Sequence, residues 1–211
     1  MENSFNRKDM EIFFVRHGES YGNVEIEPKP QFKTDNPPLT PEGLRQAEML
    51  ANRFEKGDID RIFSSALIRT AQTVHPTAEK LGLPITMLPD LNETDTRIVS
   101  ADEEEISAKT PLAIPFRGEA VPVGEESVEQ RLVRARRCMD FLLSFEGEKL
   151  LVATHGTFYR SLMRCALGLC EEEPFYFKVR NCSVTHIIFS RDRIPAVNAA
   201  NDISHLNPYG C

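Results

Sequence analysis

Short apolar runs alternate with amphipathic segments along most of this 211-residue chain. Residues 12–15 and 150–153 are apolar throughout, which is typical of strands that are covered on both faces in a parallel sheet. Shorter apolar runs predict further strands within residues 59–64 and 85–88. Strands separated by amphipathic helices predict an α/β fold, a three-layer α/β/α sandwich with a largely parallel central sheet.

Helices are predicted where apolar residues recur at spacings of three and four between capping signals. Thr40 followed by Pro41 suits a helix start, and Ser127 with Gln130 forms a capping box. Pro76 lies inside a helix, where we expect a kink or a break because proline removes a backbone hydrogen bond. The predicted buried stripes are Leu44, Ala47, Leu50, Ala51 and Phe54; Leu67, Ala71, Val74 and Ala78; Val128, Leu132, Ala135, Met139 and Leu142; and Leu162, Ala166 and Leu169.

The segment 94–124 has little periodicity and contains an acidic run with several prolines and glycines. A stretch of this length inside a compact domain favours a lid, inserted into a single domain that spans residues 1–211. Beyond it, the apolar pattern predicts strands at 177–179 and 184–189, and a weaker one at 194–200.

The formal net charge of −7 at pH 7 changes the picture by excluding one class of function. A general nucleic-acid binder needs a basic surface, so no nucleic-acid partner is expected. The arginines of the helix that begins near Ser127 lie mainly off its apolar stripe and are interpreted as surface charges; they are Arg131, Arg134, Arg136 and Arg137.

Targeting and cysteine signals are also informative. No apolar stretch is long enough to cross a bilayer and no signal or transit sequence is visible, so we expect a cytoplasmic protein without a membrane partner. The five cysteines form no CxxC pair, which argues against a zinc site and against a disulfide framework.

Two of the predicted strands end in a histidine followed by a glycine, in Arg16-His17-Gly18 and in His155-Gly156. Ligands bind at the carboxyl edge of open α/β sheets, where glycine permits close backbone approach. A histidine in this place can be a nucleophile, a base, a metal ligand or a core residue. The adjacent Arg16 favours a nucleophile, because a cation disfavours imidazolium, repels a divalent metal and attracts an oxyanion such as phosphate.

Four separated motifs resemble those of the histidine phosphatase superfamily, the phosphoglycerate-mutase-like family with an RHG motif. They follow one another in the family's order from about residue 12 to about residue 189. The motifs are Arg16-His17-Gly18-Glu19-Ser20 with Asn23, Ser64-Ser65-Ala66-Leu67 with Arg69 and Gln72-Thr73, Leu91-Asn92-Glu93, and Thr154-His155-Gly156.

The resemblance implies that His17 attacks phosphorus and becomes a phosphohistidine, which water later hydrolyses. Phosphoryl transfer develops charge on three equatorial oxygens, which preorganised donors such as arginine must hold. By the same resemblance, Glu93 protonates the leaving oxygen and then activates water. The expected catalytic residues are His17, Glu93 and His155, and the expected substrate-binding residues are Arg16, Asn23 and Arg69.

No metal and no cofactor are expected, because two arginines and a histidine supply the positive charge that phosphate needs. The short chain favours a phosphatase acting on small phosphomonoesters, with a small phosphorylated metabolite as partner. The alternative enzyme is a 2,3-bisphosphoglycerate-dependent phosphoglycerate mutase, whose family members are typically longer. The alternative from another class is a catalytically weak relative that binds phosphorylated ligands and regulates, and a homodimer is left open.

Overall fold

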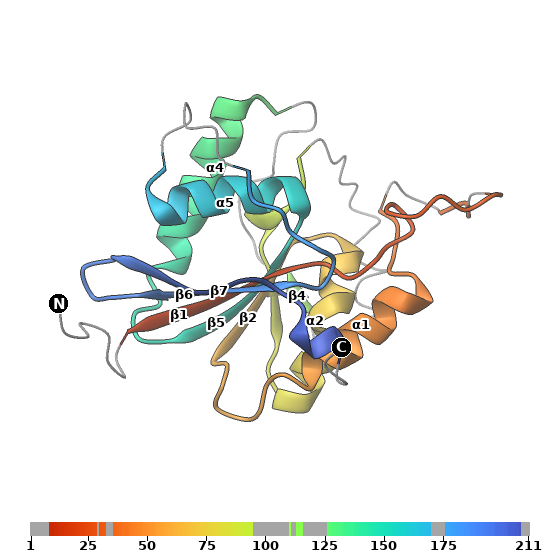
Figure 1. Ribbon diagram of the computed structural model, residues 1–211, viewed down its shortest axis with the longest axis horizontal. Helices are drawn as coiled ribbons and strands as arrows, with labels where there is room; N and C mark the ends of the chain where they lie inside the picture. The colour runs from red at the N-terminus through yellow and green to blue at the C-terminus, as the bar shows by residue number, and fades with distance from the viewer. Residues whose placement is uncertain are drawn as a thin grey trace.

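The structure is a computed structural model that describes residues 9–28, 30–32, 36–94, 110, 113–115, 126–169 and 176–207. In this part of the chain, a central sheet has the strand order β4-β3-β2-β5-β1-β6-β7 (Figure 1). The strands are β1 (Met10–Arg16), β2 (Arg61–Ser64), β3 (Ile85–Met87), β4 (Ala113–Pro115), β5 (Lys149–Thr154), β6 (Val184–Phe189) and β7 (Pro195–Asp202).

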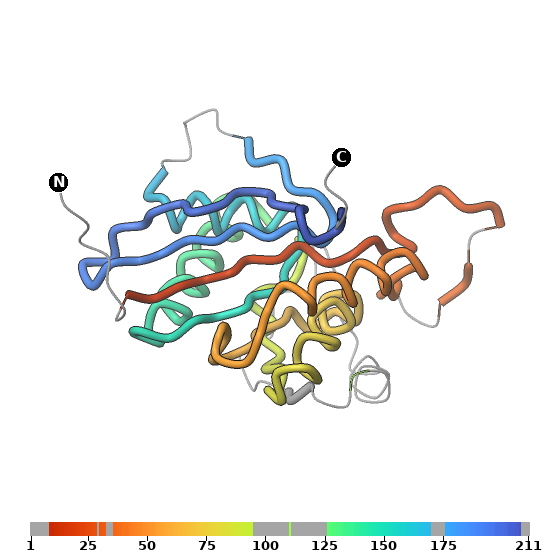
Figure 2. Tube along the Cα trace, turned by 60° about the horizontal axis from the view of Figure 1, so that its bottom comes forward, coloured from red at the N-terminus to blue at the C-terminus, as the bar shows by residue number. Residues whose placement is uncertain are grey.

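The sheet is parallel from β4 to β1 and becomes antiparallel at β6 and β7. The change occurs beside β1: in Figure 2 the blue C-terminal strands run along one side of the red strand and the teal β5 along the other. The largely parallel sheet predicted from the apolar runs is therefore confirmed. The register pairs Arg16 of β1 with Thr154 of β5, so the residues that follow both strands emerge at the same edge.

Helices cover both faces of the sheet and complete the three layers (Figure 1). On one face, α1 (Pro41–Ala51) and α2 (Ile68–Leu81) bury Leu151 and Ala153 of β5. On the other face, α4 (Val128–Leu142) and α5 (Gly156–Leu167) bury Leu150 and Val152 of the same strand. Short 3₁₀ turns, η1 (Pro89–Leu91) and η2 (Ser204–Leu206), complete the described elements.

The predicted helix starts are confirmed by the caps that form. The Thr40 side chain accepts a hydrogen bond from the Gly43 backbone N–H, and Ser127 and Gln130 form the reciprocal capping box. Of the kink or break expected at Pro76, the break does not occur, since α2 continues to Leu81. Buried residues on both sides of Pro76 hold the helix against the sheet despite the missing N–H.

Side-chain burial departs from the predicted stripes at the start of α1. Leu44, predicted to face the core, is 46% exposed, whereas Gly43 is buried. A Cβ atom at Gly43 would lie 1.9 Å from the Glu19 carbonyl oxygen. The backbone of α1 therefore packs directly against the segment after β1, and this contact turns Leu44 outward.

Two other sequence predictions are wrong for reasons that lie far away along the chain. Arg134, interpreted as a surface charge, is 4% exposed, because it binds Glu126 and the carbonyls of Asp90 and Asn92. Residues 177–179 form no strand, and the Phe177 ring packs edge-on to the ring of Tyr159 instead.

The predicted lid, 94–124, falls almost entirely outside the described residues, so the lid and the single-domain organisation stay predictions. Within the described ranges, no helix is both long and apolar enough to cross a membrane.

A matched pair of leucines on α1 tests this packing. Leu50→Ala should lower the free energy of unfolding by about 2–5 kcal/mol, because Leu50 is fully buried and its removal leaves a cavity. Leu44→Ala should change it by only about 0.5 kcal/mol, since this side chain is 46% exposed. Urea denaturation of both variants measures the difference, and equal losses would contradict the observed orientation of α1.

Candidate active site

His17 follows β1 directly and is 4% exposed. Its Nδ1 atom lies 2.7 Å from the Gly18 carbonyl oxygen, which can only accept a hydrogen bond. Nδ1 therefore carries the proton of the neutral ring, and the lone pair is left on Nε2. This tautomer gives the imidazole a nucleophilic nitrogen on the side of the ring away from the backbone.

The turn after His17 depends on a close approach between two glycines. The Gly18 N–H donates to Thr73 Oγ1 of α2 at 2.9 Å. A Cβ atom at Gly18 would lie 2.8 Å from the Gly43 carbonyl oxygen, which is too short for any side chain. Glycine at both positions lets the backbones of α1 and α2 pack closely against the turn that follows His17.

His155 follows β5, the parallel neighbour of β1, and is fully buried. Its ring centroid lies 5.1 Å from that of His17, so the two rings predicted to share an edge of the sheet do meet. His155 Nε2 lies 2.7 Å from Ser65 Oγ, while Nδ1 is buried without a hydrogen-bond partner in the described part of the chain. When Ser65 donates to Nε2, Nδ1 carries the proton and can donate to an anion.

Arg16 and Arg69 place two cations beside these rings. Arg16 donates from one terminal nitrogen to the Val179 carbonyl at 2.9 Å, and its Nε is buried with no described partner. The guanidinium packs over Gly156, where a Cβ atom would lie 3.4 Å from Nε. Arg69, in the first turn of α2, is 8% exposed and makes no side-chain hydrogen bond to any other described residue.

Burial and mutual repulsion leave this positive charge incompletely compensated. Burial lowers the pKa of Arg69 to about 10; the charge of Glu93 opposes this shift and that of Arg16 adds to it. The pKa of Arg16 is also lowered, again mainly by burial, with Glu93 acting in the opposite direction and Arg160 adding to the effect. A bound anion would satisfy both groups at once.

The same environment keeps the histidines neutral. Burial lowers the pKa of His17 well below its usual 6.5, and the charge of Arg69 lowers it further. Burial and then Arg69 have the same effect on the pKa of His155. Both rings are therefore uncharged at neutral pH, as a nitrogen nucleophile must be.

Glu93 lies after η1 and caps α5 from outside the helix. Its Oε2 accepts from the Thr157 N–H at 3.1 Å, and its Oε1 accepts from the N–H groups of Phe158 at 3.0 Å and Thr94 at 3.1 Å. These bonds satisfy helix N–H groups that His155, the N-cap residue, leaves without a side-chain acceptor. Its charge also acts on both Arg16 and Arg69, so the carboxylate shares the site with them.

Asn23 is linked to the histidine turn through its side-chain oxygen. Oδ1 accepts from the Ser20 N–H at 3.1 Å, from Ser20 Oγ at 3.0 Å and from Asn181 Nδ2 at 3.1 Å. Because the oxygen takes these three donors, the Nδ2 group keeps its own two donors for another acceptor. Through Asn181, these hydrogen bonds join Asn23 to the backbone of His17 and Gly18.

Several residues of the site carried no assignment in the sequence analysis. Ser65 and Thr73 belong to the second motif, so their positions were visible in the sequence although their contacts were not. Asn181 and Arg160 lie in no motif, and only the folded chain brings them to Arg16 and His17.

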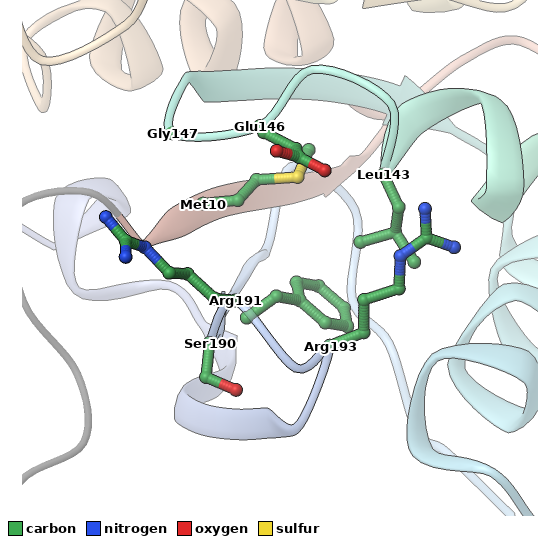
Figure 3. A pocket seen from close by; sticks show the side chains of 8 residues that line it. Met10, Leu143, Glu146, Gly147, Ser190, Arg191 and Arg193 are labelled. Carbon is green, nitrogen blue, oxygen red and sulfur yellow. The ribbon is translucent and has the colours of Figure 1, made fainter.

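A cavity of about 400 Å³ lies elsewhere, between the β6–β7 turn and the turn before β5 (Figure 3). Arg191 and Arg193 extend from the β6–β7 turn toward opposite sides of the cavity, and Glu146 and Met10 lie across it. None of the six predicted site residues lines it. In the ranges that the structure describes, no group of three or more histidines, cysteines or acids could hold a metal ion.

Neutral imidazoles, one buried and one half-buried guanidinium group and a carboxylate lie at one edge of a parallel sheet, an arrangement suited to an oxyanion. The sequence model of the histidine phosphatase superfamily (branch 1) matches residues 12–203, and the chain belongs to this family.

Its relatives carry different activities in their names. A protein from Enterobacter sp. (strain 638), named probable phosphoglycerate mutase GpmB, is 32% identical over 209 residues, covering 94% of this chain and 95% of its own length. The α-ribazole phosphatase of Shigella flexneri superposes with a TM-score of 0.69 at 22% identity, over 92% of this chain and 96% of that one. The phosphoserine phosphatase of Entamoeba histolytica gives 0.66 at 19% identity, over 93% and 99%. These structural likenesses show the shared fold.

Replacing the buried Arg69 separates its effect on the stability of the fold from its effect on anion binding. Arg69→Met should raise the melting temperature by a few degrees, because a desolvated charge is removed, and should abolish most of the stabilisation by inorganic phosphate. Calorimetry with and without saturating phosphate measures both effects. Arg136→Met, at an exposed position of α4, is the control and should leave the phosphate effect intact. A full phosphate effect in Arg69→Met would remove Arg69 from the anion site.

The buried neutral histidines predict how stability depends on pH. In the unfolded chain each imidazole binds a proton near pH 6.5, whereas in the folded chain His17 and His155 stay neutral. The unfolded state thus binds more protons below this pH, and the free energy of unfolding falls on acidification by about 1.4 kcal/mol per pH unit for each group. In denaturation series between about pH 6 and 5, His17→Gln should show a slope smaller by about this amount. An unchanged slope would mean that His17 is protonated in the folded protein.

Proposed function

We propose that this protein is a metal-independent phosphatase that hydrolyses small phosphomonoesters through a phosphohistidine on His17. The observation that carries the proposal is the neutral ring of His17, with its lone pair on Nε2, beside the guanidinium groups of Arg69, which is buried, and Arg16, which is half-buried and has an unpartnered Nε. A phosphoryl group would supply the missing acceptors and place phosphorus next to the nucleophile.

The first step forms a bond between His17 Nε2 and phosphorus and breaks the ester P–O bond. Arg16, Arg69 and His155 would donate to the equatorial oxygens, where negative charge grows. The electron pair of the broken bond goes to the leaving oxygen, which takes a proton from Glu93.

The second step reverses the roles. Glu93 takes a proton from water, the water oxygen bonds to phosphorus, and the electron pair of the N–P bond returns to His17 Nε2. The Gly18 carbonyl holds Nδ1–H throughout and stabilises the positive charge that develops on the ring. Inorganic phosphate then leaves the site formed by Arg16, Arg69 and His155.

The second candidate is a mutase, in which the phosphoryl group returns to another hydroxyl of the substrate. The relatives named phosphoglycerate mutase favour this candidate. The two reactions share the first step and differ in which acceptor meets the phosphohistidine. Product analysis therefore separates them, whereas substitution of His17 does not.

The wild-type protein and His17→Ala should be assayed against a panel of phosphomonoesters in excess EDTA. The wild type should release inorganic phosphate, and brief exposure to ³²P-labelled substrate should give an acid-labile, alkali-stable label on the protein. His17→Ala should lose the label and at least about a thousandfold in rate. Retained turnover in this variant would exclude His17 as nucleophile, and recovery of an inactive wild type by a divalent ion would contradict the metal-free scheme.

The same experiment distinguishes the alternatives. With 3-phosphoglycerate and a trace of 2,3-bisphosphoglycerate, formation of 2-phosphoglycerate without phosphate release would favour the mutase. Tight phosphate binding without turnover of any ester would favour a regulator that binds phosphorylated ligands.

A further inference from the structure

The segment 179–183 wraps around the end of β1 and contacts the two residues at the centre of the site. The Val179 carbonyl accepts from the Arg16 guanidinium at 2.9 Å, and the Cys182 N–H lies 3.0 Å from the Arg16 carbonyl and 3.1 Å from that of His17. Asn181 is the member of this segment whose side chain reaches the histidine turn. Its Nδ2 lies 3.1 Å from the His17 carbonyl and 3.2 Å from the Gly18 carbonyl.

The backbone N–H of Ser20 determines which atom of the Asn181 amide is the nitrogen. The Ser20 N–H can only donate, so the Asn23 atom that it meets is the acceptor Oδ1. Asn181 contacts this same oxygen and two carbonyl oxygens, all of which are acceptors. The atom of Asn181 at this junction must therefore be the donor Nδ2.

These contacts connect Asn181 to the nucleophile through one shared atom. The Gly18 carbonyl oxygen accepts from His17 Nδ1 at 2.7 Å and from Asn181 Nδ2 at 3.2 Å. This carbonyl decides which ring nitrogen of His17 carries the proton. Holding the carbonyl in place therefore keeps the lone pair on Nε2, the atom that attacks phosphorus in the proposed reaction.

Backbone strain marks the same place. Cys182, the next residue, has a φ of 55°, a left-handed conformation that is uncommon for a residue other than glycine. Arg180 is fixed by the bond of its N–H to Asn201 Oδ1 at 2.7 Å, and Asn201 is itself left-handed at a φ of 52°. Asn181 thus lies between Cys182, whose backbone is strained, and Arg180, whose N–H is bound by Asn201. Strain of this kind is typical of a conformation kept for its function.

We propose that Asn181 is a positioning residue for phosphoryl transfer, which fixes the Gly18 carbonyl and Asn23 so that His17 stays in the tautomer with a nucleophilic Nε2. The inference rests on the proposed phosphohistidine chemistry. Asn181 acts through His17 and Asn23 and makes no bond to phosphorus. It couples a C-terminal segment to a nucleophile near the N-terminus.

Asn181→Ala and Asn181→Asp test this role by rapid-quench measurement of His17 phosphorylation. Both should slow the step by about 10- to 100-fold, as small displacements of a nucleophile do. Aspartate has the shape of asparagine, but its side chain offers only acceptors to the three acceptor oxygens. If Asn181 acted through packing alone, Asn181→Asp would therefore phosphorylate at close to the wild-type rate. The equilibrium constant for phosphate binding should change by less than about threefold, because the arginines remain.

The matched control is Asn198→Ala on β7, where the amide bonds to Nδ1 of His186 outside the site. It should keep wild-type phosphorylation. The melting temperature of each variant shows whether that variant is folded. If an Asn181 variant is not folded, Asn181→Ser, which keeps one hydrogen-bond donor, is used in its place.

A second readout is independent of turnover. ¹⁵N spectra of labelled histidine should show His17 with a protonated Nδ1 in the wild type and a mixture of tautomers in Asn181→Ala. Wild-type phosphorylation rates and an unchanged tautomer in both Asn181 variants would overturn the inference. If the wild type itself never forms the phosphohistidine, the proposed function fails, while the tautomer measurement still decides the role of Asn181.

Discussion

One buried and one half-buried guanidinium group next to two uncharged imidazoles impose the main constraint on this structure. The whole chain carries a net negative charge, yet Arg16 and Arg69 are close enough for the charge of Arg16 to lower the pKa of Arg69, and the charge of Glu93 acts on both. Such an arrangement is unfavourable until an anion enters. The parallel register of β1 and β5, the first turn of α2 and the glycine that opens α5 all serve to hold it.

Glu93 belongs both to the candidate active site and to the N-terminal cap of α5. The carboxylate completes the N-terminus of α5 and lies in the field of both arginines. A helix N-terminus stabilises negative charge, so the position of α5 limits where this carboxylate can lie. Loss of the side chain would therefore disturb the helix cap as well as the proposed proton transfer, and the two effects would have to be measured separately.

Local patterns predicted the elements of this fold, and long-range contacts decided what those patterns missed. The apolar runs at β1 and β5 and the capping box of α4 are local signals, and the structure confirms them. Leu44 was misplaced because the backbone contact of Gly43 with Glu19 sets the rotation of α1. Asn181 had no motif, since its partners lie more than 150 positions earlier in the chain.

The contact between Gly18 and Gly43 has an evolutionary consequence. A side chain at Gly18 would meet the Gly43 carbonyl oxygen, and a side chain at Gly43 would meet the backbone of Glu19. The obstacle in both cases is main chain, which no change of rotamer can relieve. A sequence that gained a larger residue at either position would need α1 to shift first, so both positions should stay glycine among descendants of this chain.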